Sequence, residues 1–197
     1  MAGLRRIDSA FAPEREIAVL RPIVFLDIDD VLCLNSAYTG FDAQYALRSS
    51  GGPYGKPIPV DLWQRLFAAA PRSNLRALHE EFVPWYVISS SWRTGFSRAE
   101  MEMVFRNTEI DFVAENLHEG WRTADHGMGR YSGNRREEIE EWVARWHHEV
   151  SPWVALDDFE SGSSLAWHER AVLCDAGVGF SEDRLQQARA VLGGAGQ

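Results

Sequence analysis

Lysine is almost absent from this sequence, since Lys56 is the only one among 197 residues. Any catalytic role for a cation must therefore fall to arginine unless Lys56 takes it. Positive charge as a whole is scarce, because 20 Lys and Arg residues face 29 Asp and Glu, which gives a formal net charge of −9. This balance argues against broad, non-specific binding to nucleic acid or to an anionic membrane, although it leaves room for a local basic patch.

Cysteine and long apolar runs are also scarce. The only cysteines, Cys33 and Cys174, provide no disulfide framework, and we expect both to be small buried hydrophobic residues. There is no run of about 18 apolar residues and no apolar segment of the kind that opens a signal peptide. We therefore expect a cytoplasmic protein without a membrane partner. The length and the apolar fraction of 45% fit one globular domain, residues 1–197.

The most informative stretch is an apolar run, 23–26, that leads directly into Asp27, Asp29 and Asp30. Such a run fits a strand that is buried on both faces of a parallel sheet, and ligands bind beyond the carboxyl ends of these strands. Clustered carboxylates repel one another unless a cation such as Mg²⁺ neutralises them. The alternative is an aspartate-rich turn without a ligand, because aspartate is a common turn residue.

Apolar runs alternate with helical patterns along the chain, which predicts an α/β fold with a doubly wound parallel sheet. The helix expected after residue 97 has a capping box formed by Ser97 and Glu100, and Pro71 is expected to break an earlier helix. The strands are expected at 22–27, 85–88, 111–114, 153–156 and 171–174, and the helices at 61–70, 74–82, 98–106, 134–150 and 181–192.

Two loops carry further residues that could contact a substrate or a metal. The stretch 33–60 is irregular and rich in Gly, Pro and Tyr, and we interpret it as a small lid inserted after the first strand, with Lys56 as a substrate contact. A purely structural loop is the alternative. A second polar loop, 119–133, carries His126, with His118 just before it; these histidines either ligate a metal or are solvated loop residues.

Three expected strands end in polar clusters, which are Asp27 with Asp29, the serines 89–91, and Asp157 with Asp158. Because parallel strands end at the same edge of the sheet, these clusters can converge. Carboxylate oxygens suit Mg²⁺, while a serine hydroxyl and an arginine supply the donors that a phosphoryl group needs during transfer.

These clusters resemble the motifs of the haloacid dehalogenase-like (HAD) phosphohydrolases, in the same order along the chain. The first is Asp27-x-Asp29-x-Val31, the second is Ser89, and the fourth is the pair 157–158. The third is a basic residue before the fourth strand, lysine in most members and here Arg135 or Arg136. Segments 88–93 and 175–181 also resemble HAD domains associated with bacterial RNA-repair proteins. The resemblance covers residues 22–192 and implies a Rossmann-like HAD core.

The resemblance also implies a function, which is Mg²⁺-dependent hydrolysis of a phosphomonoester through an aspartyl-phosphate. Asp27 would be the nucleophile and Asp29 the general acid and base, assisted by Ser89 and Arg135. The expected metal ligands are Asp27, Asp29, Asp157 and Asp158, and the expected substrate contacts are Ser90, Arg93, Arg136 and Lys56. Arginine is not equivalent to lysine, so the basic catalytic residue is left open among Arg135, Arg136 and Lys56.

The expected substrate is a phosphorylated small molecule, a nucleotide or a nucleic-acid end. The main alternative is a non-catalytic or receiver-like phosphate-binding module on the same scaffold. A receiver domain normally places its acidic pair two strands before the phosphorylated aspartate, whereas Asp27 already ends the first strand here. A nuclease that uses the same carboxylates is a further alternative, which the negative net charge disfavours.

Overall fold

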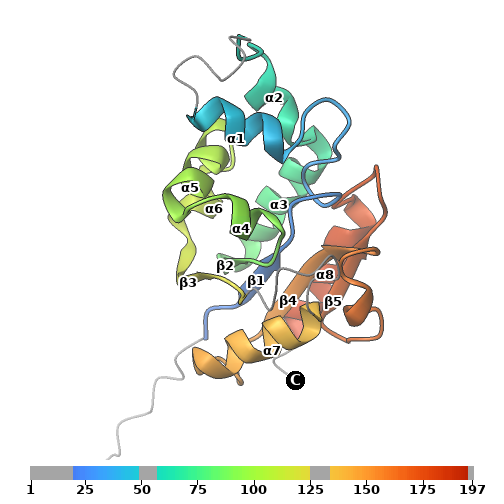
Figure 1. Cartoon of the computed structure of the whole chain (residues 1–197). Coiled ribbons are helices and arrows are strands. Elements are labelled where there is room, and N and C mark those ends of the chain that lie inside the picture. Colours follow the sequence, from blue (N-terminus) through green and yellow to red (C-terminus); the bar gives the residue numbers. More distant parts are fainter. Residues whose placement is uncertain (1–19, 49–56, 125–133, 195–197) are drawn as a thin grey trace, which may run out of the picture.

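Five parallel strands form one sheet in the order β3-β2-β1-β4-β5 (Figure 1). The structure is a computed structural model, and it describes residues 20–48, 57–124 and 134–194. The strands are β1 (Ile23–Leu26), β2 (Trp85–Ile88), β3 (Leu117–Arg122), β4 (Trp153–Asp158) and β5 (Ala171–Cys174). The expected α/β fold with a parallel sheet is thus confirmed.

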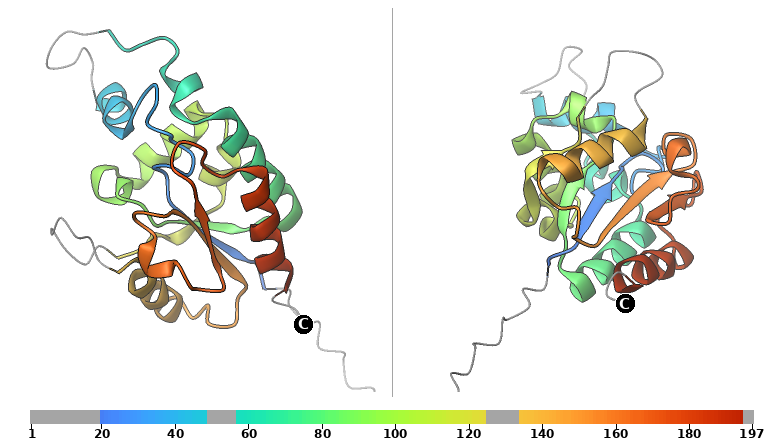
Figure 2. Two further views of the ribbon diagram at one scale, coloured as in Figure 1. Left: turned by 90° about the vertical axis from the view of Figure 1, so that its right-hand side faces the viewer. Right: turned by 90° about the horizontal axis from the view of Figure 1, so that it is seen from below.

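Helices cover both faces of the sheet, which explains why β1 is buried along its whole length (Figure 2). Side chains of β1 alternate, so that Val24 and Leu26 join one core cluster and Ile23 and Phe25 join another. The first cluster includes α3 (Ala69–Phe82), α5 (Arg98–Asn107) and α8 (Glu182–Gly194), and the second includes α7 (Arg135–Arg145).

The remaining helices are short and lie near the carboxyl ends of the strands or in connections. They are α1 (Gly40–Arg48), α2 (Leu62–Leu66), α4 (Trp92–Gly95), α6 (Asp111–Glu115) and the 3₁₀ turn η1 (Ser163–Leu165). Helix α1 lies within the stretch expected to be irregular, so the candidate lid contains regular structure. None of the helices in the described ranges is long and apolar enough to cross a membrane.

The strand predicted at 111–114 is wrong, because these residues form α6. The missing strand is β3, which the sequence analysis assigned mainly to a polar loop. It lies at the edge of the sheet, its pairing with β2 is irregular, and only Leu117 of its six residues is buried. An edge strand with this exposure does not need a continuous apolar run, so it leaves little signal in the sequence.

Two helix boundaries also differ from expectation. Pro71 lies in the first turn of α3 and does not break it, because the proline nitrogen has no partner to lose at that position. Helix α7 ends at Arg145 rather than near residue 150. His147, just beyond its end, adopts a positive φ of 57°, which turns the chain out of the helix.

The capping box of α5 is present with both of its hydrogen bonds. The Glu100 backbone N–H donates to Ser97 Oγ at 3.3 Å, and the Ser97 N–H donates to Glu100 Oε2 at 2.7 Å. Arg48 at the end of α1 contacts the same carboxylate at 2.7 Å, so α1 is attached to α5. First the Arg48 hydrogen bond and then those from Ser97 lower the pKa of Glu100 to about 2.

We predict that Ser97→Ala destabilises the protein, because the substitution removes the side-chain acceptor at the start of α5. The expected loss in the free energy of unfolding is about 1 kcal/mol, measured by denaturant titration. Ser73→Ala is the matched control, since Ser73 is an exposed residue inside α3. A loss no larger than that of the control would contradict the capping role.

Candidate active site

The register of the sheet brings three polar strand ends together. Leu26 pairs with Ile88 on one side and with Leu156 on the other, so the residues that follow these three lie side by side. The backbone continues the pairing by one residue at each boundary, with Asp27 N–H bonded to Leu156 O and Ser89 N–H to Leu26 O, both at 2.9 Å. The side chains of Asp27, Ser89 and Asp157 are all buried at this edge.

The carboxylates form a compact group, because one oxygen from each of Asp27, Asp157 and Asp158 lies within 4.8 Å of the others. Burial, and secondly the charge of Asp157, raise the pKa of Asp27 well above its usual range. Burial also raises the pKa of Asp157 to about 6. Ionising both groups is therefore costly without a cation, and this set of oxygen ligands fits a hard divalent ion such as Mg²⁺.

Arg135 is the cation that the chain itself supplies to these carboxylates. Its Nε contacts Asp157 Oδ2 at 3.0 Å, and its Nη2 lies 4.0 Å from Asp27 Oδ1. Burial disfavours its charge, but the nearby carboxylates, Asp157 foremost, outweigh this effect and raise the pKa of Arg135. Its fixed planar group can contact several carboxylates at once, which is the advantage of arginine at such a site.

A fully buried glutamate, Glu138, extends this network away from the aspartates. One of its oxygens accepts from Arg135 Nη1 at 3.2 Å, and the other accepts from Arg93 Nη2 at 2.9 Å. Arg93 also donates to Ser90 O at 2.9 Å, so it supports the end of β2. The sequence analysis missed Glu138, although its three-residue spacing from Arg135 on one helix was a usable signal.

Asp158 is held by the turn that follows β4. Its Oδ1 accepts from the backbone N–H groups of Glu160 at 2.6 Å and of Ser161 at 3.0 Å. Burial opposes the charge of Asp158, but the hydrogen bonds from Ser161 and Glu160 outweigh it and lower the pKa of this carboxyl.

The hydroxyl of Ser161 lies among all three aspartates. It is 3.3 Å from Asp27 Oδ2 and 2.6 Å from Asp157 Oδ1, and it also contacts Asp158 Oδ2. The sequence analysis missed Ser161, because a serine in a turn carries no distinctive signal.

Asp29 lies outside the group of three carboxylates and faces a different part of the site. Its Oδ2 accepts from Trp92 Nε1 at 3.0 Å and from Ser91 Oγ at 3.2 Å. It lines a cavity of about 550 Å³ between α1 and α4, to which Phe41 and Gln44 also contribute.

The serines after β2 have different surroundings. Ser89 Oγ is buried and has no hydrogen-bond partner, whereas Ser90 Oγ accepts from the Trp92 N–H at 3.4 Å, and the Ser90 hydroxyl favours the ionised form of Asp27, which lowers its pKa. An unpaired buried hydroxyl costs free energy, which a phosphoryl oxygen of a bound ligand could recover.

Several expected site residues lie elsewhere. Arg136 is exposed and pairs with Glu140 at 2.7 Å, away from the aspartates. Lys56 and His126 are outside the described residues. His118 accepts from the Gly120 N–H at 2.9 Å and packs between aromatic rings, apart from the carboxylate group.

Both cysteines are buried and free, as expected, and burial raises the pKa of each thiol to about 12.

The family described as "HAD domain in Swiss Army Knife RNA repair proteins" matches residues 23–185, which include every polar strand end described above. The chain belongs to this family. This HAD domain has no match among curated proteins and none among solved structures. Membership confirms the resemblance and indicates a phosphohydrolase type of function.

The raised pKa of Asp157 predicts a pH-dependent stability in protein freed of divalent cations. Asp157 holds its proton more strongly when folded, so its contribution to stability falls as pH rises from the ordinary value of 3.8 to about 6. We expect the wild type to lose stability relative to Asp157→Asn over this window, in thermal unfolding with a chelator. Ionisable groups away from the carboxylate group are the same in both proteins, so their contributions cancel in this comparison. A constant difference between the two would contradict the prediction.

Proposed function

We propose that this HAD domain is an Mg²⁺-dependent phosphatase that hydrolyses a phosphomonoester through an aspartyl-phosphate on Asp27. The observation that supports it most is the register of β1, β2 and β4, which holds Asp27 beside Ser89 and Asp157. Asp27 also has Arg135 within 4.0 Å. The same scaffold without chemistry would not require a buried carboxylate at this cost in desolvation.

The metal would be held by Asp27 and Asp158. Asp157 has a supporting role, because its charge is already paired with Arg135 Nε at 3.0 Å. When bound, Mg²⁺ supplies positive charge that keeps the carboxylates ionised and offsets the charge of the phosphoryl group.

In the first step, an Asp27 oxygen forms a bond to phosphorus while the bond to the leaving oxygen breaks. Asp29 donates its proton to that oxygen from the cavity beside α1. Arg135 stabilises negative charge at Asp27, and Ser89 Oγ donates a hydrogen bond to a phosphoryl oxygen. In the second step, Asp29 takes a proton from water, the water oxygen bonds to phosphorus, and the bond to Asp27 breaks. The products are inorganic phosphate and the free carboxylate.

The substrate we propose is a phosphorylated nucleotide or nucleic-acid end. The support is the association of the family with RNA repair, together with the polar and aromatic surroundings of the site. A panel of nucleotides and of oligonucleotides phosphorylated at the 5′ or 3′ end tests this class.

We predict that Asp27→Asn abolishes hydrolysis of p-nitrophenyl phosphate with Mg²⁺, since the amide has a similar shape but is not nucleophilic. Circular dichroism should show an unchanged fold. Asp30→Asn is the matched control and should keep activity, because Asp30 contacts the Gly177 N–H at 3.2 Å rather than the carboxylate group. Turnover above background in purified Asp27→Asn would remove Asp27 from the role of nucleophile.

The two roles of Asp29 can be separated with Asp29→Asn. A good leaving group such as p-nitrophenolate hardly needs a proton, so the first step should survive, while the second lacks its base and slows by roughly 10² to 10⁴. We expect a burst of p-nitrophenolate approaching one equivalent, and phosphorylated protein by mass measurement in acid. An alkyl phosphate should give no burst. A variant that binds Mg²⁺ normally without burst or phosphoprotein would contradict this assignment.

A further inference from the structure

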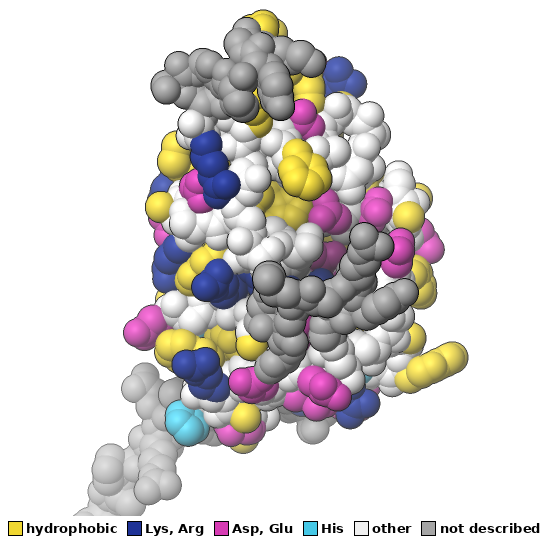
Figure 3. Space-filling view, viewed as in Figure 1, with side chains coloured by type: hydrophobic (Ala, Val, Ile, Leu, Met, Phe, Trp, Pro, Cys, Tyr) yellow, Lys and Arg dark blue, Asp and Glu magenta, His cyan; other side chains and the backbone are white. Residues whose placement is uncertain are grey.

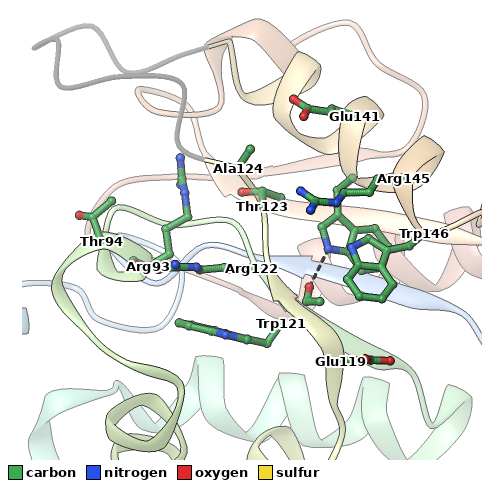
Figure 4. Close-up of a pocket in the computed structure, with 12 residues that line it drawn as sticks. Arg93, Thr94, Glu119, Trp121, Arg122, Thr123, Ala124, Glu141, Arg145 and Trp146 are labelled. Carbon is green, nitrogen blue, oxygen red and sulfur yellow. Dashed lines mark hydrogen bonds between the residues drawn. The ribbon is translucent and has the colours of Figure 1, made fainter.

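A second cavity, of about 580 Å³, lies between the end of β3 and α7 (Figure 4). It is close to the candidate active site, because the N–H of Thr123 donates to Ile88 O at 3.1 Å and Ile88 immediately precedes Ser89. Its volume is in the range of small-molecule sites. Thr94 lines both this cavity and the cavity that Asp29 lines, so the two cavities are neighbours.

Indole rings form much of the cavity wall. Trp146 follows α7 and packs against the second core cluster, whereas Trp121 of β3 packs against the first, and both are partly buried. The wall is tightly built, since Trp142 Nε1 donates to Gly120 O at 2.6 Å and a Cβ on Gly120 would come within 2.3 Å of the Trp146 ring. Such fixed aromatic surfaces suit a nucleobase, because every base can stack on an indole.

Two arginines at this cavity differ from most others in the protein. The majority of the described arginines pair with a carboxylate, but Arg122 and Arg145 form no ion pair with any described residue. Arg122 Nη1 donates to Arg93 O at 2.7 Å, and its guanidinium lies 5.2 Å from the Trp121 ring. Arg145 is exposed. Figure 3 shows basic side chains on the part of this face where β3 and α5 lie. Unpaired guanidinium groups are suited to bind a phosphate.

Thr123 provides an independent sign of a polar ligand. It lines the cavity with only 2% of its surface exposed, and its Oγ1 has no hydrogen-bond partner. A buried hydroxyl of this kind is normally paired, so a bound donor or acceptor would remove a cost that the free protein carries.

We propose that this cavity binds the second nucleotide of an oligonucleotide whose terminal phosphate lies at Asp27. Its base stacks on the indole of Trp146, which lies against Gly120, and the linking phosphodiester contacts Arg122 and Arg145. The first nucleoside, whose hydroxyl oxygen is the leaving atom, occupies the cavity beside Asp29. The inference rests on the proposed phosphatase function and adds to it a preference for chains over mononucleotides.

The test compares three substrates, which are p-nitrophenyl phosphate, a mononucleotide and a dinucleotide. Both nucleotides are prepared with the phosphate at the 5′ end and, separately, at the 3′ end. With the phosphate at one of these two ends, we expect the KM of the wild type to be about tenfold lower for the dinucleotide than for the mononucleotide. A tenfold change corresponds to the free energy of one charge-assisted hydrogen bond. Arg145→Ala should remove this preference without changing the kinetics with p-nitrophenyl phosphate, and Arg122→Ala should remove it as well.

Arg170→Ala is the matched control. Arg170 also forms no ion pair with a described residue, and its guanidinium lies 5.1 Å from the Trp153 ring, but it precedes β5 at the opposite edge of the sheet. This variant should keep the dinucleotide preference of the wild type.

Binding of the dinucleotide to Asp27→Asn, measured by calorimetry, tests the cavity without turnover. Addition of Arg145→Ala to this variant should weaken binding about tenfold. Equal KM values for the two nucleotides at both ends, or a preference that survives both arginine substitutions, would overturn the inference and leave the phosphatase function intact. Absence of turnover with all substrates would instead overturn the phosphatase function, and the binding measurement would still decide on the cavity.

Discussion

The ion pair between Arg135 and the buried aspartates is the interaction on which the rest of the site depends. Asp27 and Asp157 are almost fully buried beside each other, and each charge is costly in that environment. Arg135 offsets part of this cost from the first turn of α7, and its position is held by Glu138. The packing of α7 on the sheet, through Trp142 against Phe25, therefore also positions the charge.

The fold and the site share the same constraint, which is the register of the central strands. Because β1 pairs with both β2 and β4 in step, one apolar layer ends at the same level across three strands. The next residue on each strand can then be polar, and its side chain meets the others instead of solvent. A shift of one residue in either pairing would separate Asp27 from Ser89 or from Asp157.

The central elements could be predicted from the sequence because burial leaves a clear pattern. β1, β2, β4 and β5 are short apolar runs, and the polar residues after the first three follow directly. β3 could not be predicted, since an edge strand with a mixed sequence resembles a loop. Ser161 and Glu138 were missed for another reason. The place of Ser161 beside the aspartates depends on how a turn packs on the sheet, which no local pattern encodes. The spacing of Glu138 from Arg135 was a usable signal, but its bond to Arg93 depends on how α7 packs on the end of β2.

The use of arginine at position 135 has a consequence for the working range of the site. A lysine in a negative pocket can lose its proton in alkaline solution, whereas a guanidinium stays charged throughout the range in which proteins remain folded. Arg135 therefore acts as a constant positive charge, and any titration of the site belongs to its carboxyl groups. A change of pH therefore alters the site through Asp27 and Asp157 and leaves the charge of Arg135 unchanged.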